Sequence, residues 1–183
     1  MLSGGGNLGA LQVGMLRALF ERRIEPDLLL GCSVGALNGA AVAADPSLAM
    51  VGRLQDLWRD IADHDVMPAG LLPATVQLAR KGISIHDNAN LRKVIRTVLP
   101  TEHFEDLVVT FQCVAAALGE GTETWFSAGE LVDPILASAA LPAVSPPVEI
   151  DGKRYLDGAI VNDVPISRAV ELGCDRIFVL HVG

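Results

Sequence analysis

The pentapeptide Gly31-Cys32-Ser33-Val34-Gly35 constrains the fold more than any other part of this sequence. It follows the apolar residues 28–30 and precedes a run of small, helix-forming residues. A G-x-S-x-G motif between a strand and a helix is typical of a nucleophile elbow, a tight turn that exposes the serine hydroxyl. Gly31 and Gly35 keep side chains out of that turn, and Ser33 lies at the positive end of the helix dipole. The motif therefore predicts an α/β fold that presents Ser33 as a nucleophile.

Composition limits the classes of protein to which the chain can belong. Its 183 residues, half of them hydrophobic, suffice for a single domain spanning residues 1–183. No uninterrupted apolar run reaches the ~18 residues that a membrane-spanning helix needs. A net charge of −8 and the lack of a basic stripe argue against nucleic acid as a partner. The same charge disfavours electrostatic docking to anionic lipid, so apolar contact is the expected route to peripheral membrane binding.

Three cysteines lie in apolar stretches without the spacing of metal ligands: Cys32, Cys113 and Cys174. This pattern is typical of reduced thiols in the core of a cytoplasmic protein, and it predicts no metal site. Cys32 precedes Ser33 and is an alternative nucleophile. The glycines of the motif, however, are centred on Ser33.

The two ends of the sequence are abrupt. The N-terminus lacks the basic leader and the apolar stretch of a secretory signal. Residues 1–3 predict only the stub of a first strand, and residues 176–182 predict a strand with nothing after it. We therefore expect either a piece of a longer protein or a compact minimal version of the domain.

Helix and strand patterns alternate along the chain. Helices are predicted at about residues 10–23, 36–44, 90–99, 134–140 and 165–172, with a further helix starting near residue 47. Strands are predicted at about 27–30, 107–118, 123–127 and 176–182, and the Asp151-Gly152 turn predicts a hairpin of 148–150 with 153–155. Such alternation predicts a mostly parallel sheet covered by helices on both faces.

Residues 64–90 form the least regular part of the sequence. Pro68, Gly70, Pro73 and Gly82 interrupt an otherwise apolar segment. One interpretation is a connecting helix packed on the core. The other is a variable, lid-like segment over an acyl-chain groove, because lids and binding loops are common in such stretches.

A glycine-rich segment, Gly4-Gly5-Gly6-Asn7-Leu8-Gly9, opens the first predicted helix. Successive backbone N–H groups at a helix start form a cradle for negative charge. That charge is either a phosphate or the oxyanion formed when a serine attacks an ester. The letters also match G-x-G-x-x-G with Asp27 further on, so a nucleotide-binding or catalytically silent regulatory module is a competing hypothesis. The oxyanion interpretation accounts for both the loop and the elbow.

A nucleophilic serine needs a base to accept its proton. The chain offers four histidines: His64, His86, His103 and His181. The first three lie in polar stretches typical of solvated or capping side chains. His181 would complete the order Ser, Asp, His of the α/β-hydrolases. Too few strands precede the elbow for that fold, so a buried strand position is the favoured interpretation of His181.

Asp157 is the other candidate base. It lies just past the second hairpin strand, where Gly158 permits a turn that would project its carboxyl from the edge of the sheet. Asp157-Gly158 is also a common turn sequence with no chemical role. Burial beside an apolar groove would raise the pKa of this carboxyl and strengthen it as a base.

Several segments together resemble the patatin-like phospholipase family over nearly the whole chain. They are Leu2-Ser3-Gly4-Gly5-Gly6 with Gly9, the elbow extended through Ala36-Leu37-Asn38-Gly39, Ala137 to Pro142, Pro146-Pro147-Val148, Tyr155 to Ala159, and Asn162-Asp163-Val164-Pro165. The resemblance is weakest from residue 64 to residue 90. The sequence departs from the family at Leu8, where members often have Arg or Lys. The leucine removes a cation that could assist an anionic head group.

The resemblance implies a three-layer α/β/α fold and a serine–aspartate dyad without histidine or cofactor. Ser33 would be the nucleophile and Asp157 the base, cleaving lipid esters through an acyl-enzyme. The amides of Gly4, Gly5 and Gly6 would form the oxyanion hole. The glycines expected to support these motifs are Gly9, Gly31, Gly35 and Gly158.

Overall fold

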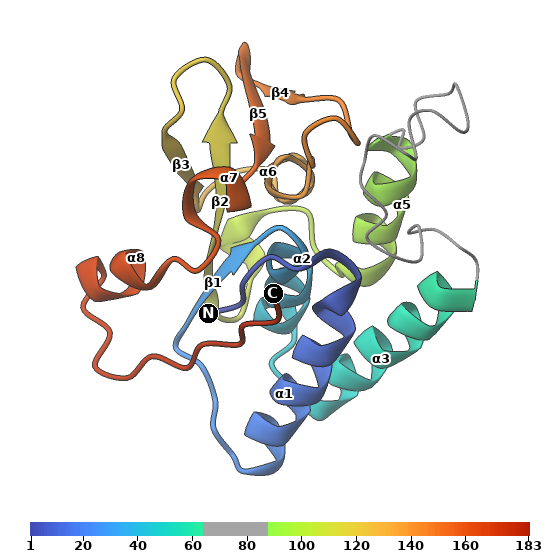
Figure 1. Ribbon diagram of the computed structural model, residues 1–183. Helices are drawn as coiled ribbons and strands as arrows, with labels where there is room; N and C mark the ends of the chain where they lie inside the picture. Colours follow the sequence, from blue (N-terminus) through green and yellow to red (C-terminus); the bar gives the residue numbers. More distant parts are fainter. Residues whose placement is uncertain (64–87) are drawn as a thin grey trace.

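The computed structural model describes residues 1–63 and 88–183 (Figure 1). The helices are α1 (Gly9–Glu21), α2 (Val34–Ala44), α3 (Leu48–Asp63), α5 (Asn88–Val98), α6 (Val132–Ser138), α7 (Ala159–Asn162) and α8 (Ile166–Glu171). The strands are β1 (Leu28–Cys32), β2 (Thr110–Ala117), β3 (Glu123–Phe126), β4 (Val148–Ile150) and β5 (Lys153–Asp157). Short 3₁₀ turns occupy Gly6–Leu8 and Phe104–Asp106. Most of the predicted elements are present, with ends shifted by a few residues.

The sheet is mixed. Strand β1 pairs in parallel with β2, whereas β3 and β5 both pair antiparallel with β2, and β4 pairs antiparallel with β5. The expected mostly parallel arrangement therefore holds only for β1, β2 and the bridges beside them. Tight turns join β2 to β3 and β4 to β5, and a short turn can connect only antiparallel strands.

The predicted strand at residues 176–182 is wrong in extent. Only Leu180 of that segment is bridged, in parallel with Leu2, and Leu2 is bridged in turn to Gly31. The partner on that side is the short N-terminal segment rather than a full strand. A ladder this short satisfies few backbone groups, so the segment remains extended without forming a strand.

Strand β2 is the central strand, and its two sets of alternating side chains face different helical layers. Phe111, Cys113 and Ala115 pack in the larger core, which also contains buried residues of α1, α2, α3, α5 and α6. On the opposite face, Gln112 meets α8 and Val114 contacts Gly158 at the start of α7. Helices thus cover both faces, and the predicted three-layer α/β/α class is confirmed (Figure 1).

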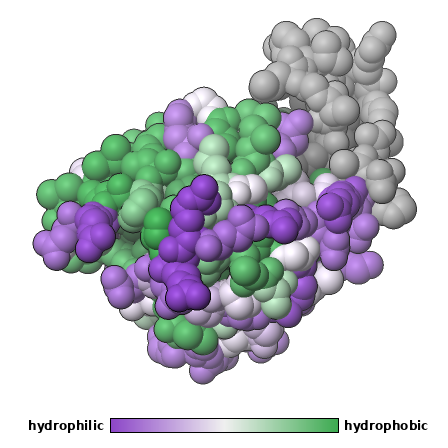
Figure 2. Space-filling view, turned by 90° about the horizontal axis from the view of Figure 1, so that it is seen from below, coloured by the Kyte–Doolittle hydropathy of each residue, from purple (hydrophilic) through white to green (hydrophobic). Residues whose placement is uncertain are grey.

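The helical layer formed by α7 and α8 leaves part of its apolar surface exposed. Hydrophobic residues gather toward the left of Figure 2, the side on which α8 lies in Figure 1. Exposed apolar side chains of α8 and the residues after it are Ile166, Val170, Leu172, Phe178 and Val179. In the described ranges, no helix is both long and apolar enough to cross a membrane.

We predict that Gly35→Ala lowers the free energy of unfolding by about 2 to 3 kcal/mol, because its Cβ would collide with the backbone carbonyl oxygens of Leu2 and Ser3. Gly52→Ala is the matched control, since its Cβ on helix α3 meets nothing within 4 Å. That variant should gain about 0.5 to 1 kcal/mol from helix propensity. Urea denaturation measures both, and equal midpoints would contradict the close approach at Gly35.

Candidate active site

Ser33 lies at a sharp turn between β1 and α2. Its backbone has φ 54° and ψ −123°, a left-handed conformation that is unusual for a residue other than glycine. The Ser33 N–H donates to Ser138 Oγ at 2.9 Å, and the Ser33 carbonyl accepts from the Ala36 N–H at 2.9 Å. These contacts hold the strained turn that the G-x-S-x-G motif predicts.

The motif glycines occupy places where a side chain would not fit. A Cβ on Gly31 would lie 2.6 Å from Ala36 Cα, and one on Gly35 would overlap the N-terminal backbone. Gly158 would meet the carbonyl of Val114, and Gly9 would meet Val34 and Trp58. Close packing against backbone thus requires glycine at Gly31, Gly35 and Gly158, and close packing against side chains requires it at Gly9.

Strand β2 brings Ser33 and Asp157 together. Residues 113–116 pair with β3 along one edge of β2, so β1 and β5 must share its other edge. Strand β1 ends at the pair Cys32 with Val114, and β5 ends at the next position, the pair Asp157 with Ala115. The carboxyl ends of β1 and β5 therefore meet on β2, which brings Ser33 and Asp157 together although they are 124 positions apart in the sequence.

The Ser33 hydroxyl donates to Asp157 Oδ2 at 2.6 Å. The other carboxylate oxygen, Oδ1, accepts the Ala159 N–H at 2.8 Å, and the Asp157 N–H donates to the carbonyl of Ala140 at 2.9 Å. Asp157 is fully buried and Ser33 is 6 % exposed. The pair is thus largely shielded from bulk solvent, with the carboxylate placed to accept the serine proton.

Burial raises the pKa of Asp157 to about 6 from its ordinary value of 3.8. The hydrogen bonds from Ser33 and from the Ala159 N–H favour the charged form and partly offset this effect, while the charge of Asp163 adds to the increase. A carboxylate with this pKa is a stronger base than a solvated aspartate and is still ionised at pH 7.

The glycine loop lies next to Ser33, and its three amides differ. The Gly4 N–H donates to Asp163 Oδ1 at 2.9 Å. In the part of the chain that the structure describes, the N–H groups of Gly5 and Gly6 have no acceptor. Positive φ angles of 150° and 55° at Gly5 and Gly6 explain why the loop needs glycine there.

A buried amide network holds both ends of the glycine loop. Gln12 Nε2 donates to the Ser3 carbonyl at 2.8 Å, and Asn38 Nδ2 donates to the Gly9 carbonyl at 3.0 Å. Asn38 also donates to Gln12 Oε1 and accepts from the Trp58 indole N–H. The role of these side-chain amides was not predicted from the sequence. The available signal was a polar side chain at an otherwise apolar helix position.

None of the alternative catalytic side chains that the structure describes hydrogen-bonds to the Ser33 hydroxyl, which donates to Asp157 instead. His181 is exposed, contrary to the predicted buried strand position, and makes no hydrogen bond or ion pair with any described residue. His103 lies 3.7 Å from Asp106 on the surface. His64 and His86 lie outside the described residues, as does most of the 64–90 segment. Cys32 is buried, and desolvation followed by the nearby Asp157 raises the pKa of its thiol, which keeps it in the unreactive protonated form.

A phosphate is a poor match for the glycine loop as the structure has it. The Gly4 N–H already donates to the Asp163 carboxylate, so a phosphate would find only the amides of Gly5 and Gly6 left among the three glycines of the loop. Asp27 is exposed at the other end of β1. Within residues 1–63 and 88–183, no cluster of three or more His, Cys, Asp or Glu side chains could hold a metal ion.

The arrangement defines a class of α/β/α protein in which a serine at a nucleophile elbow is paired with a buried aspartate. The family model described as patatin-like phospholipase matches residues 1–170. The chain therefore belongs to the patatin-like phospholipase family.

Named relatives agree with this assignment. M110.7 of Caenorhabditis elegans, named for a patatin-like phospholipase domain, is 28% identical over 185 residues, covering all of this chain and 16% of that protein. The lysophospholipase nte1 of Aspergillus terreus is 27% identical over 191 residues, which is 12% of its length. The chain thus spans less than a fifth of these relatives. VipD from Legionella pneumophila shares the fold, with a TM-score of 0.55 at 14% identity, over 90% of this chain and 46% of VipD.

Proposed function

We propose that this chain is a serine acyl hydrolase that cleaves carboxylic esters of lipids through a Ser33–Asp157 dyad. The observation that carries the proposal is the 2.6 Å hydrogen bond from the Ser33 hydroxyl to the buried Asp157 carboxylate. The hydroxyl belongs to a strained elbow residue, and its partner is a carboxylate whose pKa is raised by burial. Of the two histidines that the structure describes, His103 and His181, neither hydrogen-bonds to this pair.

In the acylation step, Asp157 accepts the Ser33 proton as Oγ forms a bond to the ester carbonyl carbon. The carbonyl oxygen becomes an oxyanion, which the amides of the glycine loop stabilise, chiefly those of Gly5 and Gly6, whose N–H groups have no acceptor among the described residues. The tetrahedral intermediate collapses, the bond to the leaving alkoxide breaks, and protonated Asp157 returns its proton to that oxygen. The alcohol or lysolipid departs and an acyl-enzyme remains.

In the deacylation step, ionised Asp157 removes a proton from water as the water oxygen attacks the acyl carbon. The same amides stabilise the second oxyanion. Collapse of this intermediate breaks the bond to Ser33 Oγ, which takes the proton back from Asp157. The fatty acid is released and the dyad returns to its starting state.

The proposed substrates are phospholipids or lysophospholipids, the class that the names of the relatives indicate. Leu8 in the glycine-rich segment and Leu11 on α1 are exposed, and so is Ile160, three residues after Asp157. We include in the proposal a peripheral contact of these apolar side chains with a lipid surface on the cytoplasmic side. Sedimentation with phosphatidylcholine vesicles tests this contact, and full recovery in the supernatant would contradict it.

A long-chain fluorophosphonate tests the hydrolase function directly, because it phosphonylates only an activated serine. Peptide mapping by mass spectrometry is expected to find a stoichiometric adduct on Ser33, and none on the Ser33→Ala variant. A folded protein that forms no adduct would refute the dyad as a hydrolytic site. The regulatory module that uses residues 4–9 without ester chemistry would then be favoured.

We predict an acid limb in the pH profile of kcat/KM with a midpoint near the pKa of Asp157, about 6. The base must be ionised, so kcat/KM should fall about tenfold for each pH unit below that midpoint. Hydrolysis of a short-chain p-nitrophenyl ester, followed from pH 4.5 to 8, measures the limb. A flat profile down to pH 4.5 would contradict a buried carboxylate as the base.

A further inference from the structure

Asp163 contacts the glycine loop but has no part in the proposed Ser33–Asp157 dyad. It follows α7, and its Oδ1 accepts the Gly4 N–H across 159 positions of sequence. A Cβ on Gly4 would overlap this oxygen and would lie 3.3 Å from Ser33 Cβ. Gly4 therefore lies against both the Asp163 carboxylate and the nucleophile elbow.

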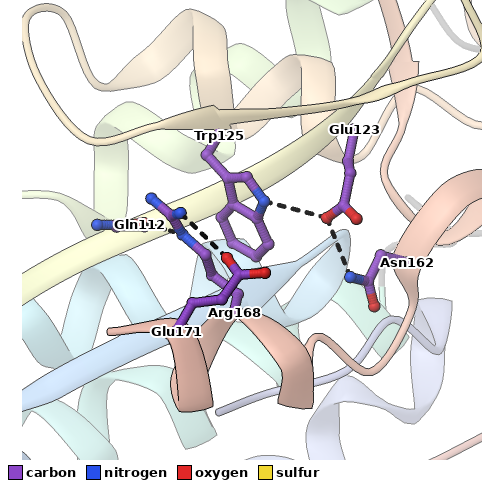
Figure 3. Close-up of polar contacts among 6 residues, drawn as sticks. All are labelled: Gln112, Glu123, Trp125, Asn162, Arg168 and Glu171. Atoms are coloured by element: carbon purple, nitrogen blue, oxygen red, sulfur yellow. Dashed lines mark hydrogen bonds and ion pairs between the residues drawn. The ribbon is translucent and has the colours of Figure 1, made fainter. Parts of the chain in front are cut away.

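The segment that carries Asp163 is fastened to the sheet on both sides (Figure 3). Just before it, Asn162 Nδ2 donates to Glu123 Oε2 of β3 at 3.0 Å, and the same oxygen accepts the Trp125 indole N–H at 3.0 Å. Beyond it, Arg168 Nε donates to Gln112 Oε1 of β2 at 3.0 Å. The Arg168 guanidinium also lies over the Trp125 ring, 5.3 Å from its centroid. The carboxylate of Asp163 is thus presented by a fixed segment.

Several contacts hold the start of the glycine loop, and the contact with Asp163 is one of them. The Ser3 carbonyl before Gly4 is held by Gln12, and the Ser3 N–H donates to the Leu180 carbonyl at 3.2 Å. Because the Gly4 N–H is anchored to Asp163 as well, both polar groups of the peptide between Ser3 and Gly4 are held, and this peptide leads directly into Gly5. The next two amides, of Gly5 and Gly6, are the ones left without an acceptor in the described chain.

We propose that Asp163 is a positioning residue that anchors the glycine loop through the Gly4 N–H, so that the amides of Gly5 and Gly6 point at the oxyanion. This proposal rests on the hydrolase function proposed above. It makes Gly4 the anchor of the loop rather than one of three equivalent donors.

Asp163 also acts on the base. The groups that face Asp157 are the Ser33 hydroxyl at the elbow, Cys32 at the end of β1 and Asp163 after α7, while β2 and α6 present the uncharged Ala115 and Ser138. The Cys32 thiol stays neutral because burial raises its pKa. The negative charge of Asp163 therefore adds to the effect of burial and raises the pKa of Asp157.

Two variants separate the hydrogen bond from the charge. Asp163→Asn keeps an acceptor oxygen for the Gly4 N–H, so its plateau kcat should stay within about threefold of wild type, with the acid limb moved to lower pH. Asp163→Ala removes the anchor, so kcat should fall ~10- to 100-fold with KM nearly unchanged. Asp56→Ala, which removes an exposed carboxylate on α3, is the control for net charge and should leave both parameters unchanged.

Three outcomes would overturn the proposal. An unchanged kcat in Asp163→Ala would mean that the contact positions nothing. A raised kcat in that variant would mean that the carboxylate blocks the oxyanion hole. Equal losses in the Asn and Ala variants would show that the accepted hydrogen bond is not what matters.

Amide exchange keeps the test separate from catalysis. In protein labelled with ¹⁵N-glycine, the Gly4 N–H should exchange slowly in the wild type and in Asp163→Asn, and fast in Asp163→Ala. Fast exchange in the wild type would refute the anchor whatever the activity. A protected Gly4 in a wild-type protein without esterase activity would support the anchor and refute only the proposed function.

Discussion

Ser33→Ala is expected to lower kcat for ester hydrolysis by on the order of 10⁶-fold, as in serine hydrolases that lose their nucleophile. The variant has no Oγ to form the acyl-enzyme, and Cys32 cannot replace it because its thiol is buried and held protonated. Any residual rate reflects water attack on an ester polarised by the glycine-loop amides. Steady-state hydrolysis of a p-nitrophenyl ester measures the loss.

Ser167→Ala, on the exposed side of α8, is the matched control and should retain full activity. Circular dichroism and a cooperative urea transition show whether the Ser33 variant is folded. A folded Ser33→Ala protein with more than about 1% of wild-type kcat would mean that another group is the nucleophile. Peptide mapping of the trapped acyl-enzyme would then identify it.

Asp157→Asn is expected to lower kcat by about 10³- to 10⁴-fold, because the amide cannot accept the Ser33 proton. The substitution is nearly isosteric, and the amide oxygen can still accept the Ala159 N–H. Substrate binding should therefore change little, so the loss should appear in kcat rather than in KM. Retained activity would move the role of base to another residue, of which His181 is the first to test by His181→Ala.

The same variant should be at least as stable as the wild type at pH 8. The pKa of Asp157 is about 6 in the folded protein and 3.8 ordinarily, so between these values the folded state binds the proton more tightly. The wild-type free energy of unfolding therefore falls as pH rises from about 4 to 6, by up to about 3 kcal/mol. The Asn variant lacks this loss, and we expect it to be more stable by about 1 to 3 kcal/mol at pH 8 and equally stable at pH 4. Urea titrations at the two pH values test this, and a destabilised variant at pH 8 would contradict it.

The elbow could be recognised in the sequence because its requirements are local. A strand, a left-handed turn and a helix start within a few residues of Ser33, and Gly31 and Gly35 are needed for backbone contacts on either side. The hairpin at Asp151-Gly152 was predictable for the same reason, since both residues have positive φ. The long helix α3 follows from the spacing of its apolar residues alone.

Features that depend on pairing between distant segments could not be predicted in the same way. Strand β5 runs antiparallel to β2 because it returns from a hairpin with β4. The segment after α8 forms a single bridge because only the N-terminal residues lie beside it. His181 illustrates the difference. An apolar run predicts a buried strand, but its exposure is decided by whether a neighbour covers it.

The nucleophile turn, the glycine loop and the position of Asp157 at a turn follow from the amino-acid sequence, because each depends on a few adjacent residues. The contact between Ser33 and Asp157 depends on tertiary structure, since two strands must end at neighbouring positions on one edge of β2. The contact of Gly4 with Asp163, which distinguishes the Gly4 amide from those of Gly5 and Gly6 in the described chain, depends on it as well. A hydrogen bond between residues more than a hundred positions apart depends on the packing of every element between them, and no local pattern records that.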